Sequence, residues 1–172
     1  GLLLLNDVLL AVIAVCAYAF LAARSSSVGA AVFTAAFLGA SALPVYAVFW
    51  MPEILNVARV AAAYFLWLYH EVAPGRLEGR WPQLAAAALL GLATYSKAFP
   101  AILVAPPVLL AWWRRKWTDG VVFGLAAVVV AGLCFAGTAA VTGELNYQGG
   151  DRRTFYGSFP FDGTGDVWNR RA

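Results

Sequence analysis

Long apolar runs separated by short polar turns dominate this chain. Residues 8–23 and 28–50 contain no charged side chain, and residues 119–141 contain one, at the first position. About 20 apolar residues in a helix cross the roughly 30 Å hydrocarbon core of a bilayer. Of the 172 residues, 62% are hydrophobic and 12% are charged, about half the charged share of an ordinary soluble domain. We therefore predict an all-α integral membrane protein.

Six transmembrane helices fit this pattern if residues 83–113 form a hairpin of two short helices. A single helix over this stretch would be about 46 Å long and would hold Lys97 near mid-membrane, at a cost of roughly 2.5–3.5 kcal/mol. A hairpin places Lys97 at the turn, and Pro100, Pro106 and Pro107 also disfavour one continuous helix. The predicted spans are residues 8–23, 28–50 with a kink at Pro44, 54–69, 83–96, 98–113 and 119–141.

The distribution of charge orients these helices. In the hairpin topology the basic turns all fall on one side of the membrane, and the opposite turns carry only Glu53 and Lys97 as charged residues. Because cytoplasmic loops are enriched in Lys and Arg, we predict a multi-pass membrane protein with the basic turns in the cytoplasm and the Glu53 and Lys97 turns facing outward. Residues 1–142 are the predicted transmembrane domain, and residues 143–172 an irregular outer segment. The residues of the basic turns are Arg24, Arg76, Arg80, Arg114, Arg115 and Lys116.

The residue pattern disfavours several other functional classes. The basic turns explain the net charge of +3, and no run of Lys and Arg interleaved with aromatic residues indicates nucleic-acid binding. Cys16 and Cys134 lie inside apolar runs, where they are typical of small buried hydrophobic residues. Because His70 is the only histidine, the sequence predicts neither a His-based triad nor a metal site, and it indicates no cofactor.

The first candidate site begins the third predicted span. Pro52 and Glu53 are favourable in the first turn of a helix, where a carboxylate faces the positive end of the helix dipole. Asn56 and Arg59 follow at intervals of three residues, so the side chains at 53, 56 and 59 lie within about 120° of one helical face. An ionisable residue as deep as Arg59 usually faces a cavity or a partner. We expect that partner to be Glu53 or Asn56; the alternative is an Arg59 contact with backbone that fixes helix packing.

The second candidate site is the hairpin turn Tyr95-Ser96-Lys97. A lysine at a helix end is often an anchor whose ammonium group reaches the membrane surface. However, Lys97 lies in an outward turn, against the usual charge bias, between helices only about 21 Å and 24 Å long. Such a turn should lie below the membrane surface, where a lysine requires a compensating anion. We expect the phosphate of a lipid-linked substrate to be that anion.

The third candidate site lies in the polar C-terminal segment. Gly149-Gly150 permits a tight turn that presents Asp151 and Arg152. Arginine binds phosphate through two parallel hydrogen bonds, and a carboxylate accepts hydrogen bonds from sugar hydroxyls. Aromatic residues on both sides could stack on a sugar ring. The alternative is a solvated loop at the membrane interface.

Together these features resemble the middle of bacterial GT-C-type membrane glycosyltransferases, the relatives of protein mannosyltransferases and of lipid A aminoarabinose transferase. The resemblance rests on the Pro-Glu turn within residues 44–72, the Thr-Tyr-Ser-Lys sequence at 94–97 and the Gly-Asp-Arg loop within 147–161. It implies a location in the lipid bilayer of the bacterial inner membrane, a polyprenyl-phosphate sugar donor and inverting transfer on the outer face. The family also implies an acidic catalytic residue in its first outer loop. No stretch here matches that loop, so we expect the chain to be a fragment of a longer protein.

The sequence leaves two functions open. Sugar transfer needs a general base for the acceptor hydroxyl and a cation near the departing phosphate. The other function is a non-enzymatic multi-pass subunit that scaffolds a membrane protein complex. For sugar transfer, Glu53 and Asp151 are the candidate catalytic residues, and the candidate substrate-binding residues are Lys97, Arg152, Arg59, Tyr95 and Asn56.

Overall fold

The computed structural model describes residues 2–48 and 53–143. The chain divides into two compact units, Gly1–Cys134 and Phe135–Ala172, and every contact discussed below lies within the first. The predicted domain boundary between residues 142 and 143 remains a prediction. Pro52, Asp151 and Arg152 lie outside the described residues, and their predicted roles stay predictions.

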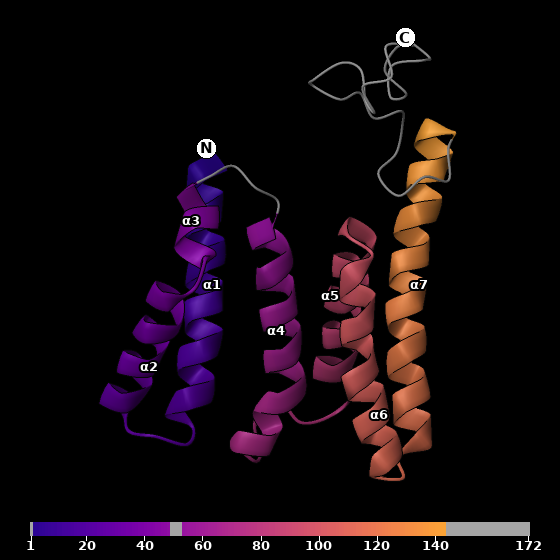
Figure 1. Ribbon diagram of the computed structural model, residues 1–172. Coiled ribbons are helices and arrows are strands. Elements are labelled where there is room, and N and C mark those ends of the chain that lie inside the picture. The colour runs from indigo at the N-terminus through magenta and orange to yellow at the C-terminus, as the bar shows by residue number, and fades with distance from the viewer. Residues whose placement is uncertain (1, 49–52, 144–172) are drawn as a thin grey trace, which may run out of the picture. The chain divides into compact units, whose positions relative to one another are not determined.

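The described residues form α-helices and one 3-10 helix, with no β-strand among them (Figure 1). The predicted all-α class is confirmed. In chain order the elements are α1 (Leu2–Ala22), α2 (Ser27–Ala40), α3 (Leu43–Val48), α4 (Glu53–Val72), α5 (Arg80–Ser96), the 3-10 helix η1 (Phe99–Val104), α6 (Ala105–Trp113) and α7 (Trp117–Thr142).

The predicted kink at Pro44 is a complete break between two helices. α2 ends at Ala40, and α3 starts at Leu43, which places Pro44 in the first turn of α3. A proline is tolerated there because the N–H groups of a first helical turn have no intrahelical acceptor. The Ser41 hydroxyl bridges the break: it donates to the carbonyl of Leu38 (2.9 Å) and accepts from the N–H of Leu43 (3.3 Å).

The predicted break at Lys97 is also confirmed. α5 ends at Ser96, and Lys97 follows in an extended conformation (φ −149°, ψ 141°) while its N–H still donates to the carbonyl of Ala93. Pro100 lies in the first turn of η1, and α6 then continues to Trp113. The chain turns back at this point, because Leu103, Val104 and Val108 of η1 and α6 pack against a cluster that contains Ala86, Ala87 and Leu90 of α5.

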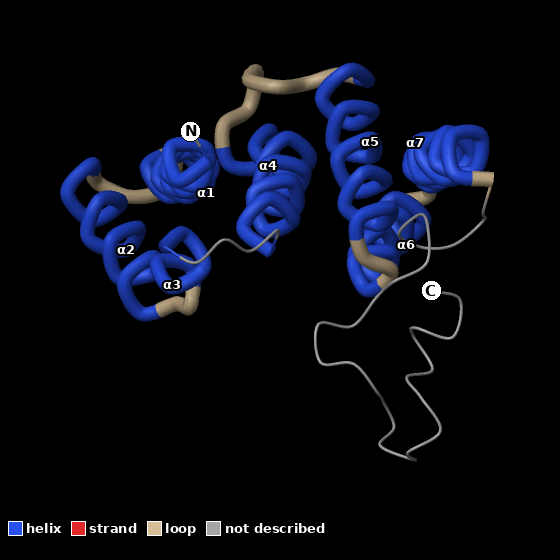
Figure 2. Tube along the Cα trace, turned by 90° about the horizontal axis from the view of Figure 1, so that it is seen from above, coloured by secondary structure: helices blue, strands red, loops and turns tan. Residues whose placement is uncertain are grey.

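α4 lies between α1 and α5 (Figure 2). Small side chains allow the helices to approach closely, and a Cβ atom added to Gly91 of α5 would lie only 2.5 Å from the carbonyl oxygen of Ala127 of α7. Only glycine therefore fits at this crossing. Two buried clusters flank α4: Ile13, Leu43, Ala47, Ile54 and Ala58 join it to α1 and α3, and Ala63, Ala86, Ala87, Leu90, Phe123 and Ala127 join it to α5 and α7.

Large apolar side chains are exposed along α1, α2 and α7. Val15, Phe33 and Leu133 are 65%, 63% and 68% exposed, respectively. Two of the described helical stretches, Leu4–Ala22 and Trp117–Val141, are long and apolar enough to cross a membrane, judged by length and composition alone. The six-span topology goes beyond this finding and remains a prediction.

Candidate functional site

α4 carries a carboxylate at each end. Glu53 lies in its first turn, and Glu71 lies next to its last residue, Val72, about 27 Å away along the helix axis. The helix dipole favours an anion in the first turn and disfavours one in the last turn. Glu71 therefore depends on cations from other elements more than Glu53 does, and each carboxylate is paired with a residue distant in sequence.

At the first end, Glu53 forms an ion pair with Lys97. The Nζ atom of Lys97 lies 2.5 Å from Oε1 of Glu53, and the two side chains are 44% and 30% exposed, respectively. The hydrogen bond from Lys97 is the main reason why the pKa of the Glu53 carboxyl lies below its usual range. The pair can form because α4 and α5 pack antiparallel, so that the first turn of α4 meets the end of α5.

This geometry bears on two of the predictions. Within the chain the anion beside Lys97 is Glu53, and the lipid phosphate expected at Lys97 stays a prediction. Arg59 was expected to bind Glu53 or Asn56, but its Nη1 atom donates a long, weak hydrogen bond to the carbonyl of Leu92 (3.5 Å). The alternative, an Arg59 contact with backbone, is therefore confirmed. Glu53 is about 9 Å away along α4, whereas α5 lies directly beside Arg59.

Four buried polar atoms on α4 and α5 near this end have no hydrogen-bond partner among the described residues. Asn56 is only 7% exposed, and neither atom of its side-chain amide has a hydrogen-bond partner among the described residues. The Oε2 atom of Glu53 and the hydroxyl of Thr94 are also buried and unpartnered. Because buried polar groups nearly always find partners, this end of the α4–α5 contact has an unfilled capacity for hydrogen bonds. Tyr95, next to Thr94, is partly buried.

An apolar groove of about 510 Å³ runs along the neighbouring face of α4. Its nearest α4 residue to the ion pair is Val57, one helical turn after Glu53. From there the groove follows α4 to Leu68, toward the end that carries Glu71. Its lining residues are Ile13, Cys16, Ala17, Phe20 and Leu21 of α1, Phe33 and Phe37 of α2, and Val57, Ala61, Tyr64, Phe65 and Leu68 of α4.

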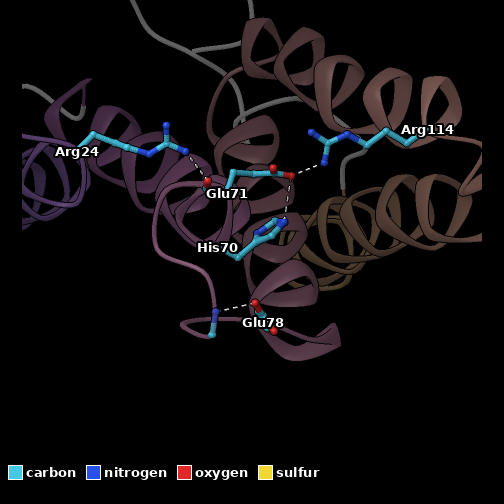
Figure 3. Close-up of polar contacts among 6 residues, drawn as sticks. Arg24, His70, Glu71, Glu78 and Arg114 are labelled. Carbon is cyan, nitrogen blue, oxygen red and sulfur yellow. Dashed lines mark hydrogen bonds and ion pairs between the residues drawn. The ribbon is translucent and has the colours of Figure 1, made fainter.

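At the other end of α4, Glu71 meets arginines from two turns and its helix neighbour His70 (Figure 3). Its carboxylate forms an ion pair with Arg114, and the Nε2 atom of His70 lies 3.2 Å from Oε1. Arg24, after α1, donates to the backbone carbonyl of Glu71 (2.9 Å). The hydrogen bond from Arg114 holds the pKa of the Glu71 carboxyl below its usual range. In the turn that follows, the Glu78 carboxylate accepts from the N–H of Gly75 (2.6 Å).

The Glu71 cluster was not predicted from the sequence. One signal was available, because an acid in the last turn of a helix opposes the helix dipole and calls for a nearby cation. The choice of Arg24 and Arg114 as its neighbours depends on how the helices pack, which the local sequence does not reveal. Their meeting agrees with the predicted topology, in which both arginines lie at the same end of the helices.

Within residues 2–48 and 53–143, no group of three or more His, Cys, Asp or Glu side chains is placed to hold a metal ion. Cys16 and Cys134 form no disulfide bond. Among the described residues, ion pairs form at Glu53 and at Glu71.

No family model, no curated protein sequence and no solved structure matches the chain. The functional proposal therefore rests on the geometry of these two clusters.

Proposed function

We propose that the chain is the multi-pass transmembrane core of a bacterial inner-membrane glycosyltransferase that takes its sugar from a polyprenyl-phosphate donor. The observation that carries this proposal is the Glu53–Lys97 ion pair, which lies beside the unpartnered amide of Asn56 and close to an apolar groove. Sugar transfer from a phosphate donor needs a proton acceptor and a cation near the leaving phosphate. Glu53 and Lys97 are groups of these two kinds.

A membrane location is supported by the surface of the helices. Side chains such as Val128 and Leu133 on α7 are more than 60% exposed, and a large apolar surface in water would promote aggregation. The contacts of Arg24 and Arg114 with Glu71 place two basic turns at one end of α4. Because basic turns face the cytoplasm, that end is cytoplasmic in our proposal, and Glu53 and Lys97 face outward.

In the proposed reaction both members of the ion pair have a role: Glu53 accepts a proton, and Lys97 stabilises the phosphate. The phosphate of the donor replaces Glu53 as the anion beside Lys97, and this exchange raises the pKa of Glu53 because a neighbouring positive charge is withdrawn. Glu53 then accepts the proton of an acceptor hydroxyl as the acceptor oxygen bonds to the anomeric carbon from the opposite side. The bond between that carbon and the phosphate oxygen breaks, and the polyprenyl phosphate leaves with its negative charge stabilised by Lys97.

The apolar groove provides a place for the lipid part of the donor. A polyprenyl chain is wholly hydrocarbon, so a groove lined by residues such as Phe20, Phe37 and Leu68 matches its chemistry. The end of the groove at Val57 lies one turn from Glu53, so a chain in the groove would hold its phosphate near the ion pair. Asp151 and Arg152 remain candidate contacts for the sugar and the phosphate.

Transfer of a labelled sugar tests the proposal directly. The intact protein, reconstituted in lipid nanodiscs with a polyprenyl-phosphate sugar, should bind the donor and release polyprenyl phosphate when an acceptor is present. A wild-type protein that neither binds polyprenyl phosphate nor transfers the sugar would contradict the proposal.

The topology is tested by labelling single cysteines placed at Gly79 and Gly163 in intact cells. Six spans predict that a membrane-impermeant maleimide reaches position 163 from outside and reaches position 79 only after the cells are permeabilised. Labelling of both positions from the same side would contradict the six-span model.

A non-enzymatic scaffold is the second candidate function. It is favoured by one observation: Lys97 already has a protein anion beside it, as a purely structural ion pair would. A scaffold predicts that the wild type transfers no sugar and that the double substitution Glu53→Gln with Lys97→Met preserves the complex in which the protein is found. An enzyme predicts that the wild type transfers the sugar and that the same double variant assembles normally and loses transfer.

A further inference from the structure

Two buried asparagines of this chain differ in one respect. Asn6 of α1 is 6% exposed, and its Nδ2 atom donates to the carbonyl of Ala47 (3.1 Å). Asn56 of α4 is 7% exposed, and neither its Nδ2 nor its Oδ1 atom has a partner among the described residues. A buried amide without partners is unfavourable for folding, so the position of Asn56 calls for an explanation that Asn6 does not need.

The direction of Asn56 follows from its neighbours on α4. Glu53 and Arg59 both contact the end of α5, at Lys97 and Leu92. Asn56 lies midway between them on the same helical face, so its amide faces the same contact. It lies one turn deeper than Glu53, whose Oε2 atom is also buried and unpartnered.

The chemistry of these atoms limits what can fill the site. Oε2 of Glu53 and Oδ1 of Asn56 accept hydrogen bonds, whereas Nδ2 of Asn56 donates two. A metal cation would leave Nδ2 unsatisfied and would be repelled by the ammonium of Lys97, 2.5 Å from the other carboxylate oxygen. A phosphate could accept hydrogen bonds from Nδ2, but its negative oxygens would be repelled by Oε2 of Glu53 and Oδ1 of Asn56. A hydroxyl group both donates and accepts, so adjacent hydroxyls can satisfy all three atoms.

We propose that Asn56 and Oε2 of Glu53 form a binding site for neighbouring hydroxyl groups of a sugar ring. This inference rests on the proposed function, and it assigns to Asn56 the recognition of the sugar while Lys97 faces the phosphate. The hydroxyls belong to the sugar of the donor or to a sugar acceptor, and the experiments below distinguish these two sources.

The first experiment measures thermal unfolding of the ligand-free intact protein in nanodiscs. Asn56→Leu removes an unpartnered amide and keeps its approximate volume, so it should raise the Tm, whereas Asn6→Leu breaks a hydrogen bond and should lower it. Thr34→Val is a second control, because Thr34 of α2 is also buried with an unpartnered hydroxyl and should behave as Asn56→Leu does. A fall in Tm for Asn56→Leu would overturn the proposal, because it would show a structural role.

The second experiment measures binding of two probes, decaprenyl phosphate and decaprenyl-phosphate mannose, to wild type and to Asn56→Leu. A donor-sugar site predicts that Asn56→Leu weakens binding of the mannosylated probe about tenfold and leaves the bare phosphate within about twofold. Thr34→Val should alter neither. If Asn56→Leu weakens binding of both probes equally, the site does not recognise the sugar of the donor. The same conclusion follows if both probes bind and Asn56→Leu alters the affinity of neither.

The third experiment separates this inference from the proposed function. If wild type binds neither lipid phosphate, the proposed function fails, and binding of methyl α-mannoside then decides the sugar site alone. Saturable binding that Asn56→Leu removes and Thr34→Val preserves supports a site for an acceptor sugar. If wild type shows no sugar-dependent binding with either the lipid probe or the methyl glycoside, the hydroxyl site is overturned.

Discussion

The two ends of α4 use the same kinds of residue in different arrangements. At one end Glu53 has one cation, Lys97, and lies among buried polar atoms that lack partners. At the other end Glu71 has Arg114 and His70 beside its carboxylate, and Arg24 on its backbone carbonyl. The Glu71 cluster holds three turns together, whereas the Glu53 end leaves hydrogen-bonding groups unused.

This difference separates a structural role from a binding role. A charged group whose partners all come from the chain stabilises the helix ends that it joins, and a ligand gains little by approaching it. A charged group beside unpartnered buried atoms can gain contacts from a ligand. By this criterion the Glu53 end is the candidate site and the Glu71 end is part of the framework.

The largest expected effect compares the two acids directly. Glu53→Gln keeps the shape of the side chain and removes the proposed base, so turnover in the sugar-transfer assay should fall at least about 100-fold. Glu71→Gln in the same assay should leave turnover within about twofold. Equal losses in the two variants, after correction for the amount of folded protein, would remove the distinction between the two ends.

A smaller effect is expected for the two cations. Lys97→Ala should weaken binding of polyprenyl phosphate about tenfold, because one charge contact with the phosphate is lost. Lys97→Arg should keep part of the affinity, since the charge is retained in a different geometry. Arg114→Ala is the matched control at the other end and should leave affinity unchanged. Binding isotherms in nanodiscs measure all three, and unaltered binding by Lys97→Ala would make Lys97 an anchor only.

The stability contribution of each ion pair should be small and similar. All four side chains, Glu53, Lys97, Glu71 and Arg114, are between 30% and 44% exposed, so solvent screens both pairs, and each should contribute about 1 kcal/mol or less. Double-mutant cycles that combine Glu71→Gln with Arg114→Met, and Glu53→Gln with Lys97→Met, measure this by denaturant unfolding. A coupling energy above about 2 kcal/mol at either end would show a pair shielded from solvent.

The smallest effect is the dependence on pH. The folded-state pKa values of Glu53 and Glu71 both lie below the ordinary value of 4.5. Each therefore contributes stability that is complete above the unfolded pKa and is lost as the pH falls through the lower folded value. The free energy of unfolding should fall with acid only below about pH 4.5. This fall should be smaller in Glu71→Gln.

The pH dependence of activity should also reflect the Glu53–Lys97 ion pair. The acid limb of kcat/KM reports the free enzyme, in which Lys97 lowers the pKa of Glu53, so it should lie below about pH 4.5. The limb of kcat should lie at higher pH, because the bound phosphate draws Lys97 away from Glu53. Limbs at the same pH would show that Lys97 stays with Glu53 throughout the reaction.

The helices and their breaks follow from local sequence. Pro44 and Pro100 end or begin helices because proline lacks an N–H, and this local effect is independent of the rest of the fold. The start of α4 at Glu53 follows from dipole and first-turn preferences that also act locally. The same local reasoning placed Glu53, Asn56 and Arg59 on one face, because helical periodicity is constant.

Which residues meet depends on how the helices pack. Lys97 is 44 positions from Glu53, and Arg114 is 43 positions from Glu71, so each pair depends on the register and rotation of packed helices. Arg59 was paired with Glu53 in the prediction because both lie on one helix, yet α5 brings Lys97 closer to that carboxylate. The unfilled hydrogen-bonding capacity of Asn56 was invisible for the same reason. A missing partner can be recognised only when all the neighbours are in place, because hydrogen bonds act over about 3 Å, a distance that sequence separation does not measure.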